Sequence, residues 1–180
     1  MKKVKVVSVV LVCLMSLVFV SCEDSVTGAG GGTGGGGQEA ALNGTWVYAG
    51  GWEDPHSWIF DNGNFEYYFH GDPRARGTFT ISGNNLLISP THFHGGQGWG
   101  VWTGGRVFDV PLGFRWYSRI ELRSAVTNYL RSAGVPDGGI SEAMEGIEIS
   151  FSPIIVPFTL VGSILTLTFP DGWVAQYIRS

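Results

Sequence analysis

The sequence predicts a mainly β fold, an antiparallel barrel with one packed α-helix. Three observations lead to this prediction. Short segments alternate between apolar and polar residues with a period of two, glycine-containing turn sequences separate these segments, and one amphipathic helical pattern interrupts them. Because antiparallel strands can be joined by tight turns, strands that follow each other in sequence are expected to pair in space.

The first half of the domain reads as a series of hairpins. Asn62-Gly63 separates two of its strands, and this dipeptide favours a type I′ turn because both residues accept a positive φ. Thr78-Phe79-Thr80-Ile81 alternates strictly, so the two large apolar side chains share one face. The strands expected in this half are 44–49, 57–60, 65–70, 77–82 and 86–89.

The C-terminal half repeats this pattern, with strands at 154–160, 164–169 and 173–178 separated by Gly162 and by Pro170-Asp171-Gly172. A slip of one residue in any strand would turn the threonines inward and expose the large apolar groups, so the register should be well defined. The side chains expected to face the interior are Phe65, Tyr67, Phe69, Phe79, Ile81, Leu165 and Leu167.

One helix is predicted from Ser118 to Ala133. Ser118 and Glu121 have the spacing of a capping box, and Gly134 with Pro136 ends the element. Its apolar stripe is expected to lie against the sheet or across an open end of the barrel. The stripe consists of Ile120, Leu122, Val126, Tyr129, Leu130 and Ala133. The segment 91–110, rich in glycine and tryptophan, is either a functional loop or an irregular strand region.

The N-terminus has the order of a secretory signal peptide. Three lysines precede an apolar run at 6–20, and the small Ser21 comes before Cys22. This end of the chain resembles the lipobox of bacterial lipoproteins. The resemblance implies that the leader is removed before Cys22, which becomes the N-terminal residue and is acylated. The alternative is an uncleaved membrane anchor with an incidental cysteine, although the run is shorter than the ~20 residues needed to span a bilayer.

The lipobox resemblance divides the chain into three parts: a signal peptide at 1–21, an acylated cysteine with a Gly-rich tether at 22–41, and a barrel domain at 42–180. Glycine-rich chains behave as random coils, so the tether should hold the domain near a membrane without fixing it. The expected partner is membrane lipid through Cys22. The expected location is the bacterial cell envelope, on the periplasmic or the outer surface.

Composition excludes several classes of function. From Cys22 onward the chain has eight arginines against fifteen acidic residues, a formal charge of about −7, which argues against nucleic acid as a partner. Cys13 and Cys22 are the only cysteines, and neither belongs to the barrel domain. No nucleophile elbow or phosphate-binding loop is present, so no catalytic residue, enzyme activity or cofactor is expected.

Two segments resemble the bacterial lipocalin-like lipoproteins, small barrels of the calycin type. These are Asn43-Gly44-Thr45-Trp46 at the first strand and Gly77 to Asn84 followed by Leu86-Leu87-Ile88. The likeness covers most of 42–178, and the Thr-Asp-Tyr motif of typical lipocalins is missing. The resemblance implies a lipocalin-like barrel in which Trp46 sits at the closed end under an arginine, a role that Arg179 could take.

The sequence is rich in aromatic residues, and this favours a ligand site or a binding surface. The leading hypothesis is a small hydrophobic ligand held inside the barrel by Phe65, Tyr67, Phe69 and Phe79, with Trp99 and Trp102 as further candidates. Alternatively, the same aromatic rings could fill the barrel interior completely and leave no cavity for a ligand.

Two further hypotheses remain open. An interaction or adhesion module could present Trp99 and Trp102, on the segment 94–105, to a carbohydrate or protein. A metal site could use His92 and His94 with His70 or His56, but this pattern is not specific and no metal is predicted.

Overall fold

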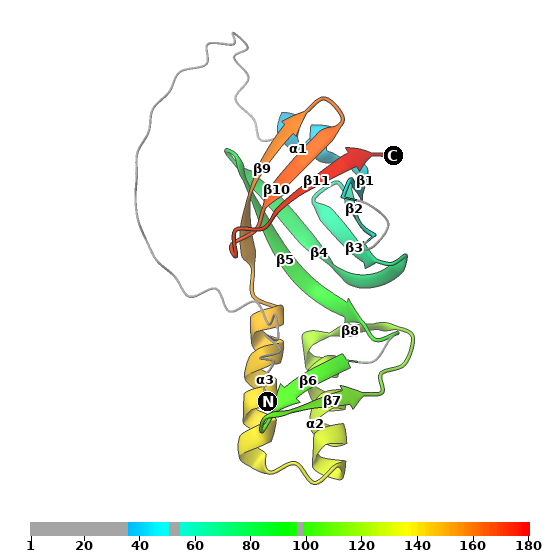
Figure 1. Cartoon of the computed structure of the whole chain (residues 1–180), viewed down its shortest axis with the longest axis vertical. Helices are drawn as coiled ribbons and strands as arrows, with labels where there is room; N and C mark the ends of the chain where they lie inside the picture. The colour runs from blue at the N-terminus through cyan, green and yellow to red at the C-terminus, as the bar shows by residue number, and fades with distance from the viewer. Residues whose placement is uncertain (1–35, 51–54, 97–98) are drawn as a thin grey trace, which may run out of the picture.

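The computed structural model describes residues 36–50, 55–96 and 99–180. Eight antiparallel strands form a closed barrel in which every strand pairs with its neighbour in sequence and the last, β11, pairs with the first (Figure 1). This confirms the predicted fold class. The barrel strands are β1 (Gly44–Tyr48), β2 (His56–Asp61), β3 (Asn64–Phe69), β4 (Asp72–Ser82), β5 (Asn85–His94), β9 (Ile154–Val161), β10 (Ile164–Thr168) and β11 (Val174–Arg179).

The interior of the barrel contains the residues that the alternation predicted. Phe65, Phe79, Leu165 and Leu167 are buried, and Ile81 packs against them with partial exposure. Tyr67 and Phe69 also face inward and are partly buried. The predicted register is therefore confirmed, since the threonines at 78, 80, 166 and 168 lie on the other side of their strands.

Tight turns and one glycine shape the barrel. Asn62 and Gly63 both have positive φ, as the predicted hairpin turn requires. At Gly77 the pairing of β4 with β5 shifts by one residue, and the backbone of Ser89 and Pro90 lies directly against the glycine. Glycine in a strand interior marks such a close approach of two backbones.

The segment between β5 and β9 is an insertion with its own core. It contains the β6–β7 hairpin (Trp99–Thr103, Arg106–Val110), β8 (Trp116–Ser118), α2 (Arg119–Ser132) and α3 (Asp137–Ser150). The C-terminal end of β5 pairs with β8, so the insertion extends from one end of the barrel (Figure 1). Its buried residues are Val101, Val110, Tyr117, Leu122, Val126, Leu130, Ile140, Ala143, Ile147 and Phe151.

Helix α2 begins with the predicted capping box, since the Ser118 hydroxyl accepts from the backbone of Glu121 and the Glu121 carboxylate accepts from that of Ser118. Its apolar stripe packs in the insertion against α3, not across a barrel end. The inclusion of Ile120 in that stripe was wrong, because this residue is 80% exposed. At 3.6 residues per turn it lies about 160° around the helix from Leu122.

The segment 91–110 consists largely of strands, which agrees with the second of the two alternatives given above. It contains the C-terminal end of β5 and the whole of β6 and β7. Helix α3 was not predicted. Helix α1 (Gly36–Leu42) was not predicted either, and it begins within the range assigned to the tether. In the part of the chain that the structure describes, no helix combines the length and apolar character needed to cross a membrane.

Candidate functional site

Helix α1 covers one end of the barrel. Leu42 at its C-terminus is fully buried, and its carbonyl accepts a hydrogen bond of 2.7 Å from the indole Nε1 of Trp46. The Arg179 guanidinium lies 4.7 Å from the Trp46 ring centroid and donates to the carbonyls of Ala41 and Asn43. The predicted position of Arg179 over Trp46 is therefore confirmed, and the arginine also ties α1 to the barrel.

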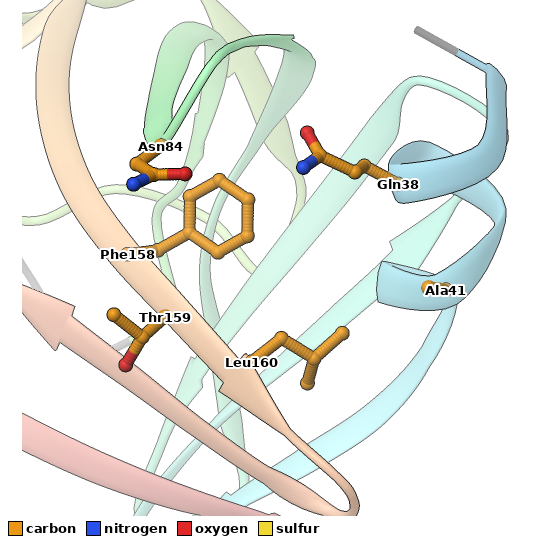
Figure 2. A pocket seen from close by; sticks show the side chains of 6 residues that line it. All are labelled: Gln38, Ala41, Asn84, Phe158, Thr159 and Leu160. Carbon is orange, nitrogen blue, oxygen red and sulfur yellow. The ribbon is translucent and has the colours of Figure 1, made fainter. Parts of the chain in front are cut away.

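A pocket of about 310 Å³ lies at this end, between α1 and β9 (Figure 2). Phe158 and Leu160 enter it from β9, and both belong to the inward-facing side of the strand. Gln38 and Ala41 face them from α1, and Gln38 extends toward Phe158. The full lining is Gln38, Ala41, Asn84, Phe158, Thr159 and Leu160.

The chemistry of this pocket is mixed. Phe158, Leu160 and Ala41 supply apolar surface, and Gln38 and Asn84 supply two carboxamides, while the Thr159 side chain points to the other face of β9 (Figure 2). Ligand sites in proteins are predominantly apolar with a few placed polar groups, and their volumes start at about 300 Å³. The volume of this pocket lies at the lower end of that range, and its lining combines an apolar wall with carboxamides.

The predicted ligand-binding residues divide into two groups. Phe65, Tyr67, Phe69 and Phe79 come together in the barrel core, packed among other side chains, and none of them lines the pocket under α1. Trp99 and Trp102 lie on β6 in the insertion, outside the barrel. Their assignment to a ligand stays a prediction, and Cys22 lies outside the described residues.

At the end of the barrel nearest the insertion, aromatic rings surround a buried histidine. The imidazole of His56 stacks on Tyr48 at 4.2 Å between ring centroids, and its Nδ1 lies 3.0 Å from the Tyr177 hydroxyl. Trp173 and Tyr67 pack around the same ring. This cluster fills the interior here with side chains, so His56 serves the packing of the barrel and is not placed beside His92 or His94.

A second hollow, of about 330 Å³, lies on the outer wall of β3, β4 and β5. Its lining includes Glu66, Arg76 and His92, which occupy paired positions across the three strands. Glu66 accepts a 2.6 Å hydrogen bond from Tyr68, and this bond together with burial raises the pKa of Tyr68 to about 12. The Arg76 guanidinium lies over the Trp116 ring.

The histidines do not assemble. His92 and His94 share a face of β5, but the His92 Nδ1 faces the Thr91 hydroxyl and the His94 Nδ1 accepts from the backbone of Gly96. Over residues 36–50, 55–96 and 99–180, no three His, Cys, Asp or Glu side chains come close enough together to hold a metal ion.

In the insertion, the β6–β7 hairpin buries one face and exposes the other. Val101 and Thr103 face α3, and the Thr103 hydroxyl donates to the Gly139 carbonyl at 2.5 Å. Trp102 and its cross-strand partner Val107 are exposed, whereas Trp99 is half-buried against Phe93.

By fold and site, the molecule is an antiparallel up-and-down β-barrel with a helix over one end, a pocket beneath that helix, and a helical insertion between its fifth and sixth strands. No family model matches the chain, and comparisons with curated proteins and with solved structures give no match.

Proposed function

We propose that this chain is a lipid-anchored, non-enzymatic protein of the bacterial cell envelope that binds a small hydrophobic molecule in a lipocalin-like barrel. The pocket between α1 and β9 carries this proposal. Two inward-facing apolar side chains of the barrel, Phe158 and Leu160, line this pocket and can be reached from outside the wall. We place the ligand there and not among the packed rings of Phe65 and Phe79.

The pocket chemistry defines the class of ligand. The apolar body of a small molecule would lie on Phe158 and Leu160, and one polar group would bond with Gln38 or Asn84 at the rim. None of the described residues that line the pocket is charged. Because a charged group would lose hydration there without gaining a counter-charge, a neutral ligand is favoured.

The ligand site can be tested with paired variants in α1. Ala40 and Ala41 are both exposed and adjacent, but only Ala41 lines the pocket. Ala41→Trp places an indole in the space, whereas Ala40→Trp adds the same ring beside it. Titration with the apolar fluorophore N-phenyl-1-naphthylamine should give saturable binding to the wild-type chain and to Ala40→Trp, and binding at least tenfold weaker to Ala41→Trp. Equal binding by all three would rule out this pocket.

The anchor rests on the leader pattern that ends at Cys22. Two or three acyl chains on one residue hold a protein on a membrane where a single chain does not, because each buried methylene contributes about 0.8 kcal/mol. Cys22→Ala should therefore move the protein from the detergent phase to the aqueous phase in a partitioning experiment. A variant that stays with membranes as the uncleaved precursor would mean that the apolar run itself is the anchor.

A second candidate function is an adhesion module, and one observation favours it. The exposed pair Trp102 and Val107 lies on the insertion, which extends from the opposite end of the barrel to α1 (Figure 1). A domain tethered through α1 could present this hairpin to a carbohydrate or protein partner. Trp102→Ser should then abolish retention on immobilised cell-wall polysaccharide, while Phe114→Ser, at another exposed aromatic, should not.

A further inference from the structure

The outer wall of the barrel is divided by charge. On β9, β10, β11 and β1 the outward positions hold aliphatic, threonine, proline and glutamine side chains, and none of them is charged. The outward positions of β2, β3 and β4 include Asp61, Glu66 and Arg76. In a chain with many more acidic than basic residues, the outward positions of these four described strands are thus uncharged.

Within this uncharged side, four aliphatic residues form a continuous row across neighbouring strands. Val161 pairs with Ile164, Ile164 pairs with Ile178, and Ile178 pairs with Val47. Their exposed fractions are 73%, 44%, 51% and 41% in the order Val161, Ile164, Ile178 and Val47. We call these four residues the aliphatic row.

The aliphatic row starts at the α1 end of the barrel, at Val161 and Ile164, and runs along the wall to Val47, whose partner on β2 is Ser57. Val161 and Ile164 flank the β9–β10 turn, and Ile178 is next to Arg179, which bonds to α1 (Figure 1). The chain that connects Cys22 to Gly36 has thirteen residues and enters the structure at this end. A glycine-rich chain of that length has a reach of about 20 Å, from 5–6 Å times the square root of the residue number.

We propose that the aliphatic row docks on the lipid surface to which Cys22 is anchored; this inference rests on the anchoring proposed above. A connection of this length places Gly36 at an average distance of about 20 Å from the anchored residue, so that contact of the row with lipid is effectively intramolecular. Val161, at the tip of a hairpin, enters the interface first. The outward positions of the described strands β9, β10, β11 and β1 hold no charged side chain, which lipid would disfavour.

A second copy of the chain is the competing occupant of this surface. Association of two copies has to overcome the loss of translational and rotational freedom, whereas the anchor has already confined the row to the membrane. Docking also orients the molecule. It places the pocket under α1 near the bilayer and directs the insertion with Trp102 away from it.

The experiment uses the acylated chain, purified from membranes and reconstituted in phosphatidylcholine vesicles. Because Cys22 is acylated and no other cysteine remains after cleavage, a new cysteine can be labelled selectively with the fluorophore NBD. Labels are placed at Val161→Cys and Ile164→Cys, with Thr78→Cys on the exposed outer face of β4 as the control. Lipids with a nitroxide on the acyl chain quench a fluorophore that reaches the membrane interior.

The inference predicts a blue shift and strong quenching at 161 and 164, and neither at 78. If the protein floats with the vesicles but all three labels behave alike, the anchor stands and docking is overturned. If it does not float, the anchoring proposal fails and docking fails with it. If the labels at 161 and 164 are shielded from aqueous iodide yet not quenched by lipid nitroxides, a second copy covers the row and the lipid proposal is wrong.

Discussion

Arg179 holds together three parts of the closed end: the Trp46 ring, the end of α1 and the last strand. A cation over an indole contributes about 0.5–2 kcal/mol, and each hydrogen bond to a carbonyl adds about 1 kcal/mol. We expect Arg179→Ala to lower the free energy of unfolding by about 2.5–4 kcal/mol. Urea denaturation measures this directly. Arg179→Lys keeps the charge but lacks the planar guanidinium that lies over the Trp46 ring, so its stability should fall between those of the wild type and Arg179→Ala. An Arg179→Ala variant as stable as the wild type would contradict the assigned role.

The cap of α2 gives a prediction about pH. The Arg115 guanidinium, followed by the backbone and hydroxyl of Ser118, lowers the pKa of Glu121 from its ordinary value of 4.5 to about 2. A carboxyl whose pKa is lower in the folded state stabilises the fold above pH 4.5, and this contribution is lost as the pH falls to 2. Glu121→Gln should therefore be less stable than the wild type at pH 7 and equal to it near pH 2. A stability difference that stays constant from pH 7 to pH 2 would exclude this origin.

Among the barrel elements, β4 depends on one glycine. A Cβ at Gly77 would lie 2.1 Å from the Ser89 carbonyl oxygen, which is backbone and cannot rotate away. At Gly100 on β6 the nearest atom to such a Cβ is a Val107 methyl group at 3.8 Å. Gly77→Ala is therefore expected to cost about 1–3 kcal/mol or more, and Gly100→Ala close to nothing. Thermal unfolding of the two variants makes the comparison, and similar melting temperatures would contradict the proposed crowding at Gly77.

Strand patterns predicted the barrel well because each strand is short, half-buried and bounded by a turn whose residues are diagnostic. The alternation of Thr78-Phe79-Thr80-Ile81 determines which face is buried, and Asn62-Gly63 determines where the chain reverses. Helix α3 was missed because Gly138, Gly139 and several isoleucines have low helix propensity. Its apolar spacing at Ile140, Ala143 and Ile147 was nevertheless helical, and packing on α2 overrides the propensity.

The candidate site was predicted only in part. Trp46 with Arg179 could be anticipated because the resemblance to lipocalin-like lipoproteins implies an arginine over the tryptophan of the first strand. The pocket could not, because α1 follows a glycine-rich stretch and was read as part of it. The break in that composition at Gln38-Glu39-Ala40-Ala41-Leu42, with residues of high helix propensity, was the available signal.

At the scale of the whole molecule, the two cores should respond differently to the same substitution. Leu165 is fully buried in the barrel and Leu130 in the insertion. Each Leu→Ala change is expected to cost about 2–5 kcal/mol. Hydrogen exchange should show Leu130→Ala loosening α2 and α3 while the amides of β10 and β11 keep their protection, and Leu165→Ala loosening the barrel. Uniform loss of protection in Leu130→Ala would mean that barrel and insertion unfold as one unit.

The central claim, that this barrel holds a small apolar molecule under α1, is tested most directly by native mass spectrometry of the acylated chain isolated from its own membranes. We predict a single additional mass that matches one neutral, largely apolar molecule per chain, retained in Ala40→Trp and absent in Ala41→Trp. A wild-type protein that carries no bound molecule, or one that carries the same molecule in both variants, would contradict the claim.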